Sequence, residues 1–162
     1  MTDIKKIMVA IGFSKYTQSN LDYAAKLASD LNAHMVIANI INIRDIEAVA
    51  SIESMGYKVD SDDYINGIKN ERRIILGEML KKSGVPDDKI EIIFKVGNPF
   101  KKLMDVIAKE NIDLLVIGVK GRTDLEHVLL GSIAEKMMRH SPIPILSYRD
   151  KNNLGNRQRF EQ

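Results

Sequence analysis

The chain has 162 residues, 44% of them hydrophobic, which is enough to bury the core of one domain. Its 24 basic and 22 acidic side chains give a formal charge of +2 and are interspersed, so composition gives no reason to expect a nucleic-acid or membrane partner. The absence of cysteine excludes disulfides, thiolate metal sites and thiol chemistry. No apolar run reaches the ~18 residues of a membrane span, and the first residues are typical of a strand rather than a signal peptide, so we expect a cytoplasmic protein.

The first part of the chain alternates strand and helix patterns. Residues 4–11 and 34–41 are short β-branched runs that predict buried strands, and residues 18–31 between them have a helical period. Ser14 or Thr17 is expected to cap this helix, because a hydroxyl at the start can accept a hydrogen bond from an unpaired N–H of the first turn. The face predicted to be buried consists of Leu21, Ala24, Ala25, Ala28 and Leu31.

A long helix is predicted in the middle of the chain. Residues 43–60 are less regular, and residues 62–82 then form a helical pattern that ends at Gly84 with Pro86 just beyond. The apolar residues of this pattern are Ile65, Ile68, Ile74, Ile75 and Met79. A strand is predicted next, over residues 89–96.

Pro99 is suited to open another helix, which is predicted to reach Asn111. The side chains that this helix is expected to turn inward are Leu103, Met104, Ile107 and Ala108.

The rest of the chain repeats the alternation. Residues 114–117 are a continuous apolar run typical of a strand buried on both faces, residues 132–140 have a helical pattern, and residues 143–148 predict a last strand. Such β-α-β alternation requires a parallel sheet with right-handed crossovers. We therefore expect one α/β domain over residues 1–148, an open parallel five-stranded sheet with helices on both faces, followed by a polar tail over residues 149–162.

Three glycines and a hydroxyl surround the connection between the fourth strand and its helix. Gly118 and Gly121 follow the apolar run, and Gly131 and Ser132 begin the helical pattern. A missing Cβ lets backbone N–H groups reach an anion, and the positive end of a helix dipole favours negative charge. Because open α/β sheets bind ligands at the carboxyl ends of their strands, the pattern predicts a phosphate site there.

These residues also have a structural interpretation. The glycines can simply serve tight turns, and Ser132 and Glu135 have the spacing of a capping box. Capping does not conflict with phosphate binding if backbone N–H groups carry most of the phosphate contact. Lys120 and Arg122 can offset phosphate charge or be solvated loop side chains.

The spacing of Gly118, Gly121, Gly131 and Ser132 resembles the nucleotide-binding signature G-x2-G-x9-G-(S/T) of the universal stress protein family. The likeness extends over most of the chain, to Gly97-Asn98-Pro99 and to the last strand. It implies a Rossmann-like, adenine nucleotide alpha hydrolase-like sheet of order 3-2-1-4-5, whose first and fourth strands form a topological switch point. It also implies a cytoplasmic stress-response protein that binds ATP, or AMP or ADP, with Mg possible through the phosphates.

The resemblance also implies which residues contact the ligand. The base and sugar side is formed by Ala10, Ile11, Gly12 and Ser14, with Ile40 against adenine. The phosphate side is formed by Gly118, Lys120, Gly121, Arg122, Gly131, Ser132 and Ile133.

The sequence departs from the family at the end of the first strand. Nucleotide-binding members usually carry an aspartate there, in the pattern D-x-S, and this chain has Gly12-Phe13-Ser14. Gly12 offers no carboxylate for a ribose hydrogen bond or an indirect metal contact.

Three function classes follow from these residues. The acids near the glycine loop, Asp124, Glu126 and Glu135, have no assigned partner, and no Walker motif is present, so binding with slow or no hydrolysis is preferred. We expect a nucleotide-dependent sensor or regulator. The alternatives are a nucleotide-free dimeric interaction module of the same family, which Gly12 favours, and an ATP-using enzyme.

Two further expectations concern assembly and the middle segment. The strand over residues 143–148 is an edge strand, and antiparallel pairing with a second copy would cover it, as the family also implies. The tail over residues 149–162 is expected to dock on a neighbour. Residues 43–60 either form a short helix that acts as a lid over the base or are a passive insertion.

Overall fold

The computed structural model describes residues 3–57, 60–119 and 130–150 of the chain. Their strands are β1 (Lys6–Ala10), β2 (His34–Asn42), β3 (Ile90–Gly97), β4 (Leu114–Gly118) and β5 (Ile145–Tyr148). The helices are α1 (Thr17–Asp30), α2 (Ile43–Ser54), α3 (Ser61–Leu80), α4 (Pro99–Glu110) and α5 (Ser132–His140), with a short 3₁₀ turn η1 (Asp87–Lys89). The strands pair in parallel in the order β3-β2-β1-β4-β5, which confirms the predicted fold class and strand order.

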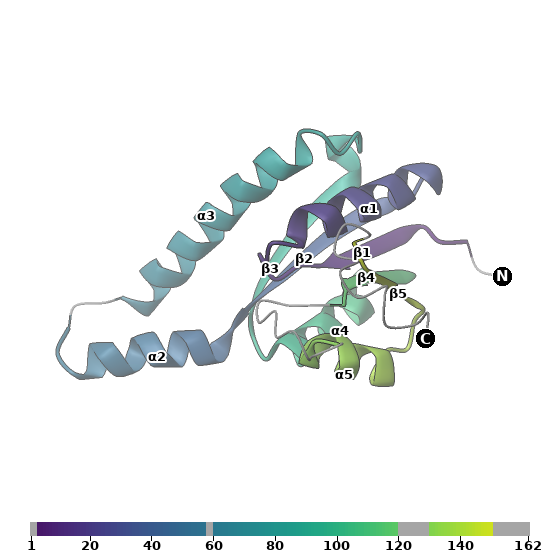
Figure 1. Ribbon diagram of the computed structural model, residues 1–162. Coiled ribbons are helices and arrows are strands. Elements are labelled where there is room, and N and C mark those ends of the chain that lie inside the picture. The colour runs from purple at the N-terminus through teal and green to yellow at the C-terminus, as the bar shows by residue number, and fades with distance from the viewer. Residues whose placement is uncertain (1–2, 58–59, 120–129, 151–162) are drawn as a thin grey trace, which may run out of the picture.

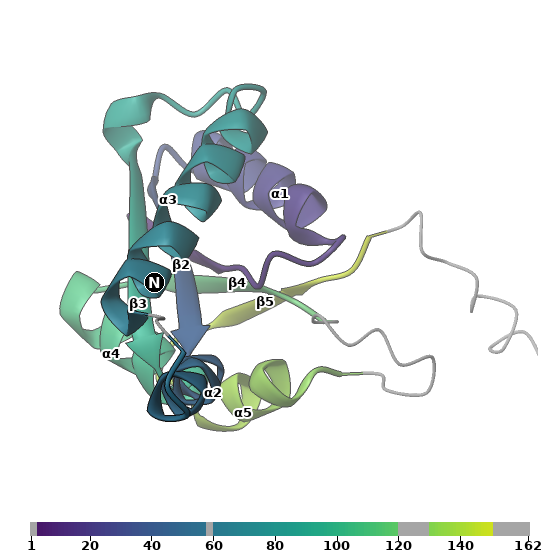
Figure 2. The ribbon, with the colours of Figure 1, turned by 90° about the vertical axis from the view of Figure 1, so that its left-hand side faces the viewer.

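Helices cover both faces of the sheet (Figures 1 and 2). Side chains of α1 and α3 pack on one face, and those of α4 and α5 pack on the other. The central strand β1 sends Ile7 and Val9 to the first face and Met8 to the second, and all three are fully buried. Because α1 leaves β1 and α5 leaves β4 on opposite faces, these neighbouring strands form the predicted switch point.

The predicted buried faces are correct apart from two residues. Leu31 is 44% exposed because it is the residue that caps the end of α1, where the chain already turns away from the sheet. On α4, Ala108 is exposed, and the larger Val106 is buried instead. Val106 lies three residues after Leu103, which places the two on one face of the helix, whereas Ala108 falls about 100° beyond Ile107 toward solvent.

The predicted hydroxyl cap of α1 is wrong. Tyr16 is the N-cap, and its side chain makes no capping hydrogen bond. The hydroxyl of Ser14 accepts from the Tyr16 N–H at 3.2 Å, and its carbonyl accepts from the Thr17 N–H, so Ser14 shapes the turn that precedes the helix. The Thr17 hydroxyl is buried and has no hydrogen-bond partner among the residues that the structure describes.

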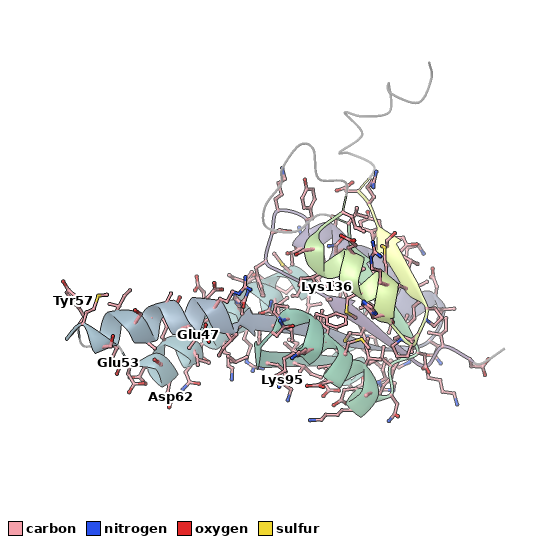
Figure 3. The ribbon with its side chains drawn as sticks, turned by 90° about the horizontal axis from the view of Figure 1, so that it is seen from below. Glu47, Glu53, Tyr57, Asp62, Lys95 and Lys136 are labelled. Atoms are coloured by element: carbon pink, nitrogen blue, oxygen red, sulfur yellow. The ribbon has the colours of Figure 1, made fainter. Side chains whose placement is uncertain are left out.

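The segment of residues 43–60 is mostly the helix α2, which with α3 forms an arm that projects from the sheet (Figures 1 and 3). Asn42 caps α2 by accepting from the Arg44 N–H, and Asp60 caps α3 through the N–H groups of Asp62 and Asp63. Figure 3 shows Tyr57 at the end of the arm.

Most of α3 therefore packs against α2 or faces solvent rather than the sheet. Leu76 is its one buried residue, whereas Ile74 is 70% exposed and Ile75 is also exposed. The apolar pattern predicted a helix correctly, but this helix passes over the sheet only near its C-terminal end.

The last predicted strand is shorter than expected. β5 begins at Ile145 rather than at 143, since Pro144 cannot donate to a ladder, although its carbonyl accepts from the Leu115 N–H. Among the described residues, no helix is both long and apolar enough to cross a membrane. The tail beyond Asp150 lies outside the described residues.

Candidate functional site

A pocket of about 530 Å³ lies at the carboxyl ends of the central strands, at the switch point between β1 and β4. It is of the size that small-molecule ligands occupy. All the predicted site residues that the structure describes line it: Ala10, Ile11, Gly12, Ser14, Ile40, Gly118, Gly131, Ser132 and Ile133. The predicted phosphate contacts Lys120, Gly121 and Arg122 lie outside the described residues, as do the loop acids Asp124 and Glu126.

Sequence reasoning missed seven lining residues, namely Asn20, Ala38, Asn42, Pro99, Leu103, Ile117 and Ala134. Most of these are apolar residues, and an apolar residue in a strand or helix is expected in the core, so the sequence does not indicate that it also lines a pocket. Asn20 had a signal that could have found it. It lies three residues after Thr17 and four before Ala24, on the face of α1 that packs on the sheet, where an amide is unexpected.

The exit from β1 is an unusual turn held from two sides. Phe13 has a positive φ of 53°, a conformation that residues other than glycine rarely adopt. Asn39, which is buried, donates through Nδ2 to the Ile11 carbonyl at 2.8 Å and accepts from Arg72 at 2.6 Å. The Arg72 guanidinium lies 5.1 Å from the centre of the Phe13 ring. These contacts fix where Gly12 and Ser14 meet the pocket.

Gly12 itself has room for a side chain. A Cβ built on it meets no heavy atom within 4 Å, and its φ is not in the left-handed region. The backbone at this position would therefore accept an aspartate, and its conformation does not require glycine.

Gly118, at the exit from β4, is a glycine for a reason that the sequence did not indicate. A Cβ at this position would collide with the Asn20 carboxamide, whose Cγ would lie 3.2 Å away. The glycine thus leaves room for the Asn20 carboxamide against the end of β4.

The start of α5 forms the opposite wall. Gly131 is the N-cap, with φ −65° and ψ 149°, and its N–H donates to the Val119 carbonyl at 2.8 Å. The predicted capping box does not form, because Ser132 is already the first helical residue and Glu135 accepts from Arg139 at 3.0 Å instead. The first turn of a helix leaves N–H groups unpaired within the helix, and at Ser132 and Ile133 this turn borders the pocket.

No described residue that lines the pocket is ionisable, so its polar side chains are hydroxyls and carboxamides. Among the described residues, no three histidine, aspartate or glutamate side chains gather as metal ligands would. Tyr148 lies beside the pocket, where it pairs with Gly118 across β4 and β5. Burial first, and then the charge of Asp150, raises the pKa of the Tyr148 phenol. The described walls can thus bind through backbone dipoles and neutral groups, and they offer no general base.

An open parallel sheet with a pocket at its switch point, bounded by a strand exit and a helix start, defines a protein of the Rossmann-like α/β class. The chain matches the family model described as "Universal stress protein family" over residues 3–149, and it belongs to that family. Universal stress protein MJ0577 of Methanocaldococcus jannaschii is 23% identical over 157 residues, which cover 92% of this chain and 97% of that one.

Solved structures share the fold. The structure of MJ0577 has a TM-score of 0.75, with 93% of this chain and 99% of that chain covered. A universal stress protein in complex with cAMP is 22% identical, with a TM-score of 0.59 and coverage of 91% and 98%. The universal stress protein from Archaeoglobus fulgidus in complex with dAMP is 16% identical, with a TM-score of 0.59 and coverage of 91% and 100%.

Proposed function

We propose that this chain binds an adenine nucleotide, ATP or its relatives ADP and AMP, in the pocket between β1 and β4, and acts as a nucleotide-dependent sensor in the stress response. The observation that carries the proposal is the convergence of Gly12, Ile40, Gly118 and Ser132, which are far apart in sequence, on one pocket. Relatives with the same fold form complexes with cAMP and dAMP, which supports an adenine ligand. Mg would be held through the phosphates, and we expect the protein to work in the cytoplasm.

Turnover is proposed to be slow or absent. Phosphoryl transfer needs a group that positions water and usually a carboxylate that holds magnesium, and neither is found among the described lining residues. A turnover assay with ATP tests this part of the proposal.

The substitution Gly131→Asp tests the phosphate site. Gly131 is an N-cap with extended backbone, where aspartate is a favoured residue, so the variant should fold at least as stably as the natural chain. The new charge would repel phosphates next to it, and a loss of a few kcal/mol corresponds to ~100-fold weaker binding. Isothermal titration with ATP measures the loss.

The control is Gly131→Asn, which has nearly the same shape and caps as well but carries no charge. It should bind ATP much more tightly than Gly131→Asp. Equal affinity of the natural chain and Gly131→Asp would contradict a phosphate site at the start of α5.

A nucleotide-free interaction module is the second candidate, and the absence of a carboxylate at Gly12 favours it. Nucleotide extracted from the denatured, freshly purified protein would decide between the two. We expect an adenine nucleotide in the extract, and an empty extract together with no binding in titration would favour the second candidate.

We also propose a homodimer through the C-terminal strand. β5 pairs with β4 on one side only among the described residues, and its second edge presents unpaired backbone groups. Antiparallel pairing about a two-fold axis would cover the edges of both copies. Sedimentation at micromolar concentration should give a dimer, and a monomer there would refute the pairing.

A further inference from the structure

Asn20 is a buried residue of the pocket whose carboxamide is paired by no other residue in the described part of the chain. The residue is 6% exposed, and no hydrogen bond joins its carboxamide to another described residue. Its amide atoms are open to the pocket, because in the described part of the chain the Thr17 hydroxyl is the one fully buried side-chain group without a partner. An unpaired amide on a pocket wall therefore points to a partner that enters the pocket.

Asn39 shows what a purely structural asparagine looks like in this molecule. It is 1% exposed, and its two amide atoms bond the Ile11 carbonyl and Arg72. It does not line the pocket. Asn20 is also buried, but it lines the pocket and its carboxamide makes no hydrogen bond to another described residue.

The position of Asn20 ties it to the floor of the pocket. It projects from the second turn of α1 and lies against Gly118, at the end of β4, where the chain has no Cβ that would exclude it. Because Asn20 is buried and Ser132 is exposed, Asn20 belongs to the inner part of the pocket and Ser132 to its rim. A ligand would therefore meet Asn20 with its inner part, whereas outer phosphates would extend toward Ser132 at the exposed rim.

The other polar lining groups have less to offer there. Asn42 uses its side-chain oxygen to cap α2, and the Ser14 hydroxyl accepts from the Tyr16 N–H. Ser132 is exposed. Among the described lining residues, Asn20 is thus the buried one whose side chain has both a donor and an acceptor to give.

We propose that the Asn20 carboxamide anchors the bound nucleotide by hydrogen bonding to the nucleoside monophosphate part that AMP, ADP and ATP share. It would supply a neutral contact in a pocket where Gly12 supplies no carboxylate, so the nucleotide is held without dependence on a divalent ion. This assignment rests on the proposed nucleotide site. It makes Asn20 a residue that determines affinity.

The test is isothermal titration of the full chain with AMP and with ATP, each with Mg and with EDTA. For the natural chain we expect affinities for ATP that differ by less than about threefold between Mg and EDTA. Asn20→Ala and Asn20→Leu should weaken AMP and ATP binding by the same factor, about three- to tenfold, the range of one net hydrogen bond. Ser19→Ala is the matched control, because it removes a polar group from the same helix outside the pocket, and it should bind as the natural chain does.

Thermal unfolding without ligand separates this role from a structural one. Removal of an unpaired amide should leave the midpoint of Asn20→Leu unchanged or raise it, whereas a structural asparagine would lower it. Asn20→Asp provides a second signature, because a carboxylate on the floor should weaken ATP in EDTA more than Asn20→Ala does, and Mg should restore part of the loss.

The failures can be told apart. If the natural chain binds no nucleotide, the proposed function is wrong, and this assignment with it. If the natural chain binds and both Asn20→Ala and Asn20→Leu bind equally well, the assignment alone is wrong. A loss confined to ATP would also overturn it, since Asn20 would then contact the outer phosphates.

Discussion

A carboxylate introduced at Gly12 should tighten the binding of ATP with magnesium. Gly12 lines the pocket, and a Cβ at this position meets no heavy atom within 4 Å. Because its φ also lies outside the left-handed region, we expect neither a clash nor backbone strain to reduce the affinity of Gly12→Asp for ATP. A charge-assisted hydrogen bond to a ribose hydroxyl, or to water on the metal, contributes about 1.5 to 3 kcal/mol, which is roughly ten- to a hundredfold in affinity.

The sign should reverse when magnesium is removed. Two unit charges 4 Å apart interact by about 4 kcal/mol at an effective dielectric constant near 20, so an uncompensated aspartate would repel the phosphates. Gly12→Asp should therefore bind ATP more tightly than the natural chain in Mg and more weakly in EDTA. Gly12→Asn, which adds the same volume without charge, should show no such dependence on the metal.

Isothermal titration of the three proteins under both conditions, with circular dichroism to confirm the fold, measures the effect. If Gly12→Asp changes neither the affinity nor its metal dependence while the fold is intact, the sugar and phosphates do not lie beside Gly12. The nucleotide-free interaction module would then be the preferred function.

Three further predictions concern the polar groups around the pocket. Thr17→Val should raise the free energy of unfolding by about 1 kcal/mol in urea denaturation, because the Thr17 hydroxyl is buried without a partner, whereas Thr17→Ser, which keeps the hydroxyl and loses the methyl, should lower it. Asn39→Leu should cost about 2 to 3 kcal/mol in the same assay, since it leaves the Ile11 carbonyl unpaired, and a loss below 1 kcal/mol would contradict the structural role of Asn39. The raised pKa of Tyr148 implies that its phenol stabilises the fold below about pH 10 and that this contribution is lost as the pH rises through the folded pKa. Tyr148→Phe should therefore weaken the fall in stability as the pH rises above the ordinary tyrosine pKa of about 10, and an unchanged alkaline profile would contradict it.

The fold was predictable because its signals are local and repeated. Each strand is a short apolar run, and the faces of α1 and α4 have the 3.6-residue period, so the alternation alone required a parallel sheet. The strand order came from the resemblance. An error fell where the apolar pattern runs past the end of its helix, as at Leu31, which is the C-cap of α1. The pattern that includes Ile74 predicted a helix correctly but did not indicate that much of this helix lies in the arm, away from the sheet.

The candidate site was predictable in the parts that backbone chemistry determines. Gly118 follows a strand, and Gly131 and Ser132 begin a helix. The strand end and the helix start can each be predicted from a few neighbouring residues. The capping box at Ser132 was wrong for the same local reason. Its S-x-x-E spacing is satisfied, but the helix begins one residue earlier than that box requires, with Gly131 as the N-cap.

The polar floor of the pocket could not be read from spacing, because it is made by contacts between distant segments. Asn20 matters through its contact with Gly118, which is nearly a hundred residues away in the chain, and Asn39 through its bonds to Ile11 and Arg72. The sequence shows that Thr17, Asn20 and Asn39 are polar residues at positions that a helix or strand would bury. Only the tertiary structure shows that the Asn39 side chain is hydrogen-bonded and that those of Thr17 and Asn20 are not bonded to any described residue. This difference in hydrogen bonding separates the structural asparagine from the one proposed to bind a ligand. Asn39 holds the turn after β1, and Thr17 is a hydroxyl without a described partner away from the pocket. Of these three residues, Asn20 is the one that lines the pocket, and no described residue pairs with its carboxamide.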